Sequence, residues 1–240
     1  MGKLKKLILD LLFPPRCAYC KEVVPIDEVL CEQCTGLLRD RFADVKLCPR
    51  CGKTAESCVC SYGLCFKGCV TVFEYSGKTT SEIFRILKTD PESRMSDKLA
   101  ELMAEKFVQS DLSKLKFDLI TNVPASSKTL EQKGFDHAAL LAQKLSAIVG
   151  IPYCVPPIIR KDDSEIQHKL KGSQRRQNAE KSYRAAKDTA VCGRVLLVDD
   201  IITTGATLNI CGRLLLSLGA KEVYCITAAT TLFSDKKQQK

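Results

Sequence analysis

Eight cysteines near the start of the chain fall into closely spaced pairs, and this spacing constrains the fold more than any other feature of the sequence. The pairs are Cys17 and Cys20, Cys31 and Cys34, Cys48 and Cys51, and Cys58 and Cys60. A CxxC turn presents two thiolates from one tight bend, and two such bends complete a tetrahedral metal site. The sequence therefore predicts two structural zinc (Zn²⁺) sites of four cysteines each, in a small double zinc ribbon. Because four thiolates leave no open position for substrate, neither metal is expected to be catalytic.

The second of these sites is less well defined than the first. Its last pair has CxC spacing, and Cys65 and Cys69 follow closely. The sequence leaves open which of Cys58, Cys60 and Cys65 complete the site, and how ligands are shared between the two ribbons. The remaining cysteines are isolated in apolar surroundings and are predicted to be inert core thiols. These are Cys154, Cys192, Cys211 and Cys225.

The first 16 residues combine a basic start with an apolar run that Asp10 interrupts. Since no small-residue cleavage site follows, we expect a short amphipathic helix here rather than a signal peptide. Its apolar face would be formed by Leu4, Leu7, Ile8, Leu11 and Leu12. No stretch approaches the roughly 18 apolar residues of a membrane span, so a cytoplasmic location is expected.

Beyond the cysteine-rich part, strand-like and helix-like segments alternate. The expected strands cover residues 69–75, 117–123, 194–200 and 222–231, and the expected helices cover 80–88, 96–110, 135–150 and 206–218. Such alternation predicts an α/β fold with a parallel sheet that helices flank on both faces. The expected division of the chain is an N-terminal helix (1–16), a double zinc ribbon (17–66) and an α/β domain (67–240).

The segment VLLVDDIITTGATLN, residues 195–209, carries two adjacent acids from an expected buried strand into a loop without lysine or arginine. Ligands of parallel α/β sheets bind at the carboxyl ends of the strands, where Asp199 and Asp200 are expected. Backbone N–H groups of the loop, with the start of the next helix, can hold a phosphate without a basic side chain. The candidate phosphate-binding residues are Thr203, Thr204, Gly205, Ala206 and Thr207.

This segment resembles the phosphoribosyl-pyrophosphate (PRPP) binding motif of type I phosphoribosyltransferases. The resemblance implies that Asp199 and Asp200 are the catalytic-site acids and accept hydrogen bonds from the ribose 2′- and 3′-hydroxyls. It also implies that Mg²⁺ arrives with the pyrophosphate group, which the ITNVPASS segment would hold through Pro124, Ala125, Ser126 and Ser127. A P-loop is excluded because the pattern GxxxxGK[ST] is absent.

Along nearly its whole length the chain resembles the ComF family, in which a cysteine-rich ribbon precedes a phosphoribosyltransferase-like domain. The motifs that carry this resemblance are FEYSG, ILK, VPASS, KGFDHA, QRRQNAEKSY and LLVDDIITTGATL. The resemblance implies a role in natural competence, with incoming single-stranded DNA and a competence helicase or ATPase as partners. One departure is KGFDH, where the family usually has RGFNQ, which places Lys133, Asp136 and His137 at the substituted positions.

Residues 160–184 form a polar segment with eight basic and four acidic residues. In phosphoribosyltransferases a loop in this place closes over the substrate, so this segment is a candidate flexible loop. Its candidate pyrophosphate-binding side chains are Lys169, Lys171, Arg175 and Arg176. A solvated insertion and a nucleic-acid-binding segment remain alternatives. The chain carries a net charge of +9, whereas residues 17–60 carry −1, so a DNA-binding surface is expected on residues 61–240.

Whether the site catalyses a reaction is left open by the sequence. Purine-salvage relatives carry an aspartate general base at the position of Thr203, and a hydroxyl accepts a proton poorly at neutral pH. His137 and His168 are expected to be surface residues without a role, because neither lies in the PRPP-binding motif. Two hypotheses remain: a PRPP-binding protein that acts in DNA uptake, and an active phosphoribosyltransferase with an unidentified acceptor.

Overall fold

The computed structural model describes residues 12–40, 45–75, 77–91, 94–161 and 182–232. Most of the expected N-terminal helix lies outside these ranges, and so do four candidate loop residues and one histidine. They are Lys169, Lys171, Arg175, Arg176 and His168.

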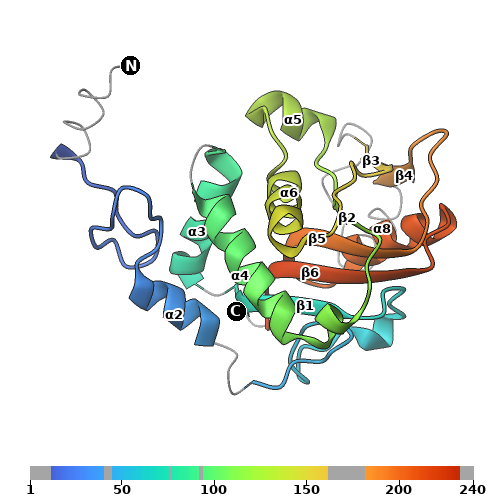
Figure 1. The fold of residues 1–240 in the computed structure, drawn as a ribbon, viewed down its shortest axis with the longest axis horizontal. Coiled ribbons are helices and arrows are strands. Elements are labelled where there is room, and N and C mark those ends of the chain that lie inside the picture. Colours follow the sequence, from blue (N-terminus) through green and yellow to red (C-terminus); the bar gives the residue numbers. More distant parts are fainter. Residues whose placement is uncertain (1–11, 41–44, 76, 92–93, 162–181, 233–240) are drawn as a thin grey trace, which may run out of the picture.

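A four-stranded parallel sheet forms the centre of the molecule (Figure 1). Its strands lie in the order β1 (Cys69–Glu74), β6 (Glu222–Thr230), β5 (Arg194–Ile202) and β2 (Leu119–Asn122). Every neighbouring pair is parallel, with Val198 opposite Ile226 and Ile120 opposite Leu196. The predicted parallel α/β fold is confirmed. β5 and β6 are central and almost fully buried, which explains their nearly continuous apolar sequences.

Successive residues of β5 face two different apolar cores. Leu196 and Val198 belong to one buried cluster, whereas Val195 and Leu197 belong to the other. This follows from the period of two in a strand, which sends alternate side chains to opposite faces of the sheet. The sheet therefore separates two hydrophobic cores.

Helices cover the first face, as Figure 1 shows. They are α3 (Gly77–Thr89), α4 (Met95–Gln109) and α6 (His137–Val149). α6 begins at the N-cap Asp136, whose side chain accepts hydrogen bonds from Ala138 and Ala139, and ends before Gly150 in the left-handed region. These are local start and stop signals of the kind the sequence displays.

Three short elements were not predicted from the sequence. The helix α5 (Ser127–Lys133) follows β2, where a loop was expected. An antiparallel pair, β3 (Ile158–Arg160) and β4 (Tyr183–Ala185), lies at the two ends of the candidate flexible loop. Strands of three residues are too short for a periodic signal.

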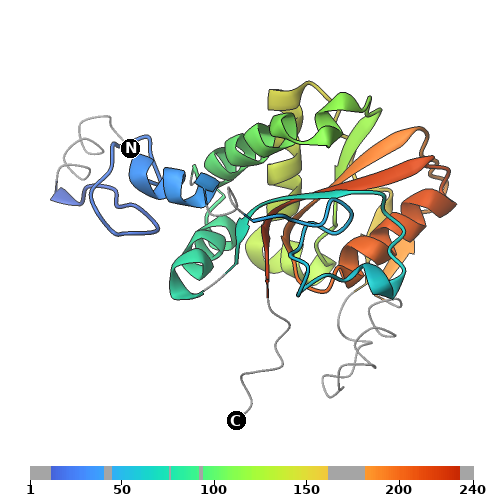
Figure 2. The same cartoon turned by 90° about the horizontal axis from the view of Figure 1, so that it is seen from below.

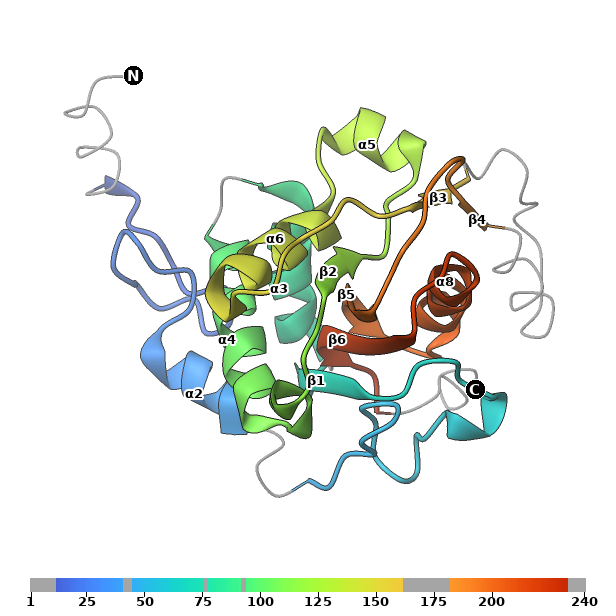
Figure 3. The same ribbon diagram turned by 45° about the vertical axis from the view of Figure 1, so that its right-hand side comes forward.

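The second face of the sheet is covered by α8 (Ala206–Ser217) and by the second cysteine-rich segment, which Figure 3 shows beneath β1. Gly52 approaches β1 closely: a Cβ atom there would lie 2.6 Å from Thr71 Oγ1 and 3.2 Å from the Cys69 carbonyl oxygen. Only glycine fits this contact at φ +69°. The second ribbon thus covers β1 on the face of the sheet that α8 also covers.

The first cysteine-rich segment and α2 (Glu32–Asp40) lie on the other side, beside α3 and α4 (Figure 2). Leu30 and Leu38 are buried in the first core. Arg39 forms a two-contact ion pair with Glu105 of α4, at 2.6 and 2.7 Å. The two cysteine-rich segments therefore pack against different parts of the α/β domain.

The prediction for the isolated cysteines is right for two and wrong for two. Cys211 and Cys225 are buried, whereas Cys154 and Cys192 are exposed. Cys154 leaves the core because the chain runs over the surface after Pro152, and Cys192 precedes the turn at Gly193. In the described part of the chain, no helix has the length and apolar character needed to cross a lipid bilayer.

Candidate functional site

The eight cysteines that were predicted as metal ligands gather into two groups of four. One group is Cys17, Cys20, Cys31 and Cys34, and the other is Cys48, Cys51, Cys58 and Cys60. Within each group all sulfur atoms lie within 4.8 Å of one another. The distance is 3.8 Å from Cys20 to Cys31 and 3.6 Å from Cys48 to Cys60. Tetrahedral zinc with Zn–S bonds of about 2.3 Å needs sulfur atoms about 3.8 Å apart, so both groups fit structural zinc.

Cys65 does not join the second group. Its backbone N–H donates to Asn209 Oδ1 at 2.6 Å, and its thiol donates to the Asn209 carbonyl oxygen at 3.2 Å. The CxC pair of Cys58 and Cys60 is thus the one that completes the group. Burial works to raise the pKa of Cys48, but hydrogen bonds from the Cys51 and Arg50 backbone outweigh it and lower the pKa to about 7. The turn at Cys48 therefore favours the thiolate form of this cysteine, which is the form that binds metal.

Asp199 and Asp200 lie near the carboxyl end of β5, which continues to Ile202. The backbone N–H of Asp200 donates to Asp199 Oδ1 at 2.9 Å, and the N–H of Ile201 donates to Asp200 Oδ1 at 2.7 Å. The strand is thus two residues longer than the sequence indicated. The two acids therefore lie within the strand and not at its last position.

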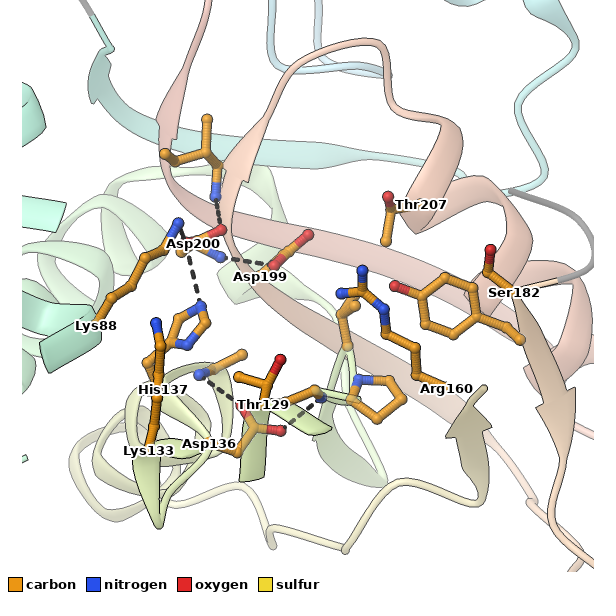
Figure 4. A pocket seen from close by; sticks show the side chains of 16 residues that line it. Lys88, Thr129, Lys133, Asp136, His137, Arg160, Ser182, Asp199, Asp200 and Thr207 are labelled. Atoms are coloured by element: carbon orange, nitrogen blue, oxygen red, sulfur yellow. Dashed lines mark hydrogen bonds and ion pairs between the residues drawn. The ribbon is translucent and has the colours of Figure 1, made fainter. Parts of the chain in front are cut away.

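A cavity of about 440 Å³ opens beside these two acids (Figure 4). It is bordered by the ends of β2 and β5, by the start of α6 and by the β3–β4 pair. Its charged lining residues are Lys88, Lys133, Asp136, His137, Arg160, Asp199 and Asp200. The carboxyl edge of the parallel sheet is therefore the site, as expected for this fold class.

Asp200 is bound on the cavity wall by two side chains that the sequence analysis did not assign to the site. Lys88 Nζ lies 2.7 Å from Asp200 Oδ2, and His137 Nε2 lies 3.3 Å from the same oxygen. Burial works to raise the pKa of Asp200, but the His137 hydrogen bond and the Lys88 charge outweigh it and hold this pKa well below its usual value. Asp200 is therefore a firmly ionised carboxylate.

Asp199 is in the opposite electrostatic situation. Burial and the neighbouring Asp200 charge raise its pKa well above the usual value. No ion pair of Asp199 occurs among the described residues. The two adjacent acids thus form an asymmetric pair, which can hold one negative charge more easily than two.

The loop after β5 encloses a second, smaller hollow of about 20 Å³ that shares Asp199, Ile201 and Thr207 with the large cavity. Ile202, Thr203, Gly205, Ala206 and Leu208 complete its lining. The first N–H groups of α8 lack partners inside the helix, so this end attracts anions.

Thr204 is the exception among the candidate phosphate-binding residues. It lines neither space, and its hydroxyl accepts a hydrogen bond from Ala206 N at 3.4 Å. Its side chain therefore acts on the start of α8 rather than on the hollow.

The four residues expected to hold pyrophosphate separate into two pairs. Pro124 and Ala125 line the cavity. Ser126 is buried and caps α5, because its hydroxyl accepts a hydrogen bond from Thr129 N at 3.2 Å, and Ser127 is exposed. Neither serine lines the cavity, since the unexpected helix α5 turns them away from it.

Asp136 supports this part of the wall. It accepts hydrogen bonds from Ala125 N at 2.9 Å, from the first amides of α6, and from Asn122 Nδ2 at 3.3 Å. Aspartate and asparagine are equally good N-caps, so the departure from the family motif at this position keeps the same support. The Asp136 carboxylate thus connects the end of β2, the turn at Ala125 and the start of α6 through hydrogen bonds.

The expectation that His137 lies on the surface is wrong. Its side chain is 18% exposed and lines the cavity beside Asp200. Lys88 and Arg160 were also missed as site residues. Lys88 ends the ILK motif and His137 belongs to KGFDHA, so both stood in motifs that carried the resemblance. Arg160 had no signal beyond its place at the start of the polar segment.

The sheet, the loop after β5 and the two cysteine groups define a type I phosphoribosyltransferase-like domain joined to a double zinc ribbon. Two family models agree with this. The "Phosphoribosyl transferase domain" matches residues 129–240, and the "Double zinc ribbon domain" matches residues 8–69.

The chain is similar to several curated relatives. It is 28% identical over 228 residues to "DNA utilization protein YhgH" of Salmonella typhimurium, covering 90% of this chain and 98% of the relative. It is 38% identical over 94 residues to "Competence protein F" of Haemophilus influenzae, covering 38% and 41% of the two chains. It is also 27% identical over 203 residues to "Competence protein ComFC" of Streptococcus pneumoniae, covering 82% and 86%. The chain is thus similar to these proteins along most of its length, and it contains both domains that the family models describe.

Proposed function

We propose that this protein binds PRPP together with Mg²⁺ at the cavity beside Asp199 and Asp200, and that it acts in the cytoplasm in DNA uptake or utilisation. The observation that carries the proposal is the junction of two spaces. The hollow of the loop after β5 and the 440 Å³ cavity share Asp199 and Thr207. One ligand can place a phosphate at the mouth of the hollow and its polar body in the cavity.

In this proposal the 5′-phosphate of PRPP lies at the open mouth of the hollow, against the loop of residues 203–207. Backbone amides and the start of α8 bind it, which explains why a loop without basic residues suits an anion. Asp199 and Asp200 accept hydrogen bonds from the ribose hydroxyls. Because Asp200 is held by Lys88 and His137, its carboxylate is already oriented when the ligand arrives.

The pyrophosphate group is proposed to lie toward Pro124, Ala125, Lys133 and Arg160, which line the cavity. Lys133 and Arg160 supply positive charge there, and Mg²⁺ would neutralise more of the pyrophosphate when it binds with the ligand. Lys169, Lys171, Arg175 and Arg176 belong to the segment that starts just after Arg160, and we propose that they add further charge. Arg160 and Ser182, which flank this segment, both line the cavity.

The role in DNA handling is supported by the relatives, whose printed names refer to DNA utilisation and competence. The surplus of basic residues outside the first 60 positions favours a polyanionic partner. We propose single-stranded DNA as this partner, with a competence helicase or ATPase as a protein partner.

Calorimetry with PRPP and Mg²⁺ tests the binding proposal. Asp199→Asn combined with Asp200→Asn is expected to weaken PRPP binding by at least about 100-fold, because the ribose loses two carboxyl acceptors, of which Asp200 is charged. The zinc content of this variant is expected to stay unchanged. Asp27→Asn combined with Asp111→Asn changes the net charge equally at exposed positions and is expected to bind normally. Absence of PRPP binding to the unmodified protein would refute the proposal.

A second candidate function is transfer of phosphoribose from PRPP to an acceptor. The position of His137 favours it, since an imidazole in the cavity can take a proton from an incoming nucleophile. Release of pyrophosphate from PRPP in the presence of candidate bases would establish transfer. In that case His137→Gln should slow release at least about tenfold while the PRPP dissociation constant changes little. If the protein binds PRPP but releases no pyrophosphate, only the binding function is supported.

A further inference from the structure

The floor beneath the candidate phosphate loop comes from two side chains of the second ribbon together with Ile202 at the end of β5. A Cβ atom built on Gly205 would lie 3.6 Å from Val59 Cγ2 and 3.7 Å from Leu64 Cδ2. Val59 stands between the cysteines Cys58 and Cys60 and is 6% exposed. Both apolar side chains are thus within van der Waals range of the turn where the loop enters α8.

Two hydrogen bonds hold this floor in place. Arg50, which stands between Cys48 and Cys51, donates from Nη2 to the Leu64 carbonyl oxygen at 2.7 Å. The next residue, Cys65, donates its backbone N–H to Asn209 Oδ1 at 2.6 Å, and Asn209 lies in the first turn of α8. The cysteine knuckle, the floor and the helix start are therefore connected in one chain of contacts.

A third connection reaches the beginning of the loop. Lys53 is only 2% exposed, and its ammonium group donates to Thr230 Oγ1 at 3.1 Å and to the Thr231 carbonyl oxygen. The backbone N–H of Thr231 donates to the Ile202 carbonyl oxygen at 3.1 Å. Since Ile202 directly precedes the loop, the second ribbon supports the loop at its entrance as well as below.

We propose that the second cysteine group is a positioning device for the phosphate loop, so that zinc bound by Cys48, Cys51, Cys58 and Cys60 keeps residues 203–207 in their binding conformation. Between residues 45 and 68 the only helix or strand is the 3-10 helix Cys60–Tyr62. Because regular secondary structure holds so little of this backbone, we expect metal ligation to add to the hydrogen bonds that fix it. The inference rests on the proposed phosphate-binding role of the loop, and Val59 and Leu64 act on the ligand only through Gly205.

The first cysteine group serves as an internal contrast. Its ion pairs run to α3 and α4, where Lys21 meets Glu82 and Arg39 meets Glu105. Val24 lies in this ribbon, is 4% exposed and belongs to the core on the opposite face of the sheet from the loop floor. Truncating Val24 and truncating Val59 remove the same two methyl groups from equally buried positions.

The experiment compares Val59→Ala with Val24→Ala in the full chain, by calorimetry with PRPP and Mg²⁺ and by zinc analysis. We expect Val59→Ala to raise the PRPP dissociation constant about tenfold, whereas Val24→Ala changes it less than about twofold. Val59→Ile should keep the affinity of the unmodified protein, because the isoleucine side chain still fills the floor. Arg50→Gln removes the hydrogen bond to Leu64 but no cysteine. We expect it to raise the dissociation constant while both zinc ions are retained.

Equal effects of Val59→Ala and Val24→Ala on PRPP binding would overturn the positioning role, and so would an unchanged dissociation constant in Val59→Ala and Arg50→Gln. These outcomes differ from a failure of the proposed function, in which the unmodified protein binds no PRPP at all.

Discussion

Lys88 Nζ lies 2.7 Å from Asp200 Oδ2, which joins the last turn of α3 to the end of β5 across the cavity. His137 Nε2 contacts the same oxygen from the start of α6. Asp199, one residue earlier, has no ion pair in the described part of the chain. Two adjacent aspartates are thus held in opposite electrostatic environments.

This asymmetry predicts opposite stability effects for the same substitution. The pKa of Asp199 is raised in the folded state by burial and by Asp200, so the protein loses stability as the pH rises from the unfolded-state pKa to the folded-state pKa. Asp199→Asn should therefore raise the melting temperature by a few degrees near neutral pH, and the gain should shrink as the pH falls. The measurement is thermal unfolding of the ligand-free protein over a pH series.

Asp200→Asn should have the reverse effect. The pKa of Asp200 is depressed despite its burial, because the His137 hydrogen bond and the Lys88 charge favour the carboxylate. Its stabilising contribution is present above its unfolded-state pKa and is lost as the pH falls through the folded value. We expect a loss of about 1–3 kcal/mol near neutral pH that disappears in acid. Equal shifts for the two variants would contradict the asymmetric pair.

Gly52 offers a test of how tightly the second ribbon packs on the sheet. Gly52→Ala places a methyl group 2.6 Å from Thr71 Oγ1 at φ +69°, and we expect it to cost about 2–5 kcal/mol in chemical denaturation. Gly63 has the same φ but no atom within 4 Å of a built Cβ. Gly63→Ala should cost only the backbone strain of about 1–2 kcal/mol. Similar costs at the two glycines would mean that the ribbon can move away from β1.

Measuring the zinc content tests whether Cys60 or Cys65 completes the second cysteine group. Cys60→Ser removes one of four clustered thiolates, so we expect the zinc content to fall from about two to about one per chain. Cys65→Ser should keep both ions, because Cys65 contacts Asn209 instead. Loss of zinc from Cys65→Ser with retention in Cys60→Ser would reverse the ligand assignment.

DNA binding is expected to depend on salt. Each phosphate contact with single-stranded DNA contributes about 0.7 to the slope of log affinity against log salt. Arg175→Ala combined with Arg176→Ala should weaken binding and reduce that slope by about 1.4. Lys46→Ala combined with Lys114→Ala, at exposed positions, is the charge-matched control. Unchanged binding after the double arginine substitution would remove this segment from the DNA surface.

Long periodic elements of the fold were predictable, and short ones were not. The continuous apolar sequences of β5 and β6 predict buried strands, and the N-cap and C-terminal glycine of α6 predict a helix. α5 was missed because its apolar content is too low for a helical stripe, although the Ser126 cap was present in the sequence. As a consequence, Ser126 and Ser127 were expected to face a ligand and do not line the cavity.

The sequence by itself determined the eight clustered cysteines and the acid pair followed by a phosphate-type loop, because in both cases the chemistry depends on residues only a few positions apart. Tertiary structure alone decided that Lys88 and His137 hold Asp200, that Cys65 stays outside the metal group, and that Val59 lies beneath Gly205. These contacts join distant segments through the packing of helices and ribbon on the sheet. No local spacing encodes such packing, since it depends on which faces the folded chain must bury.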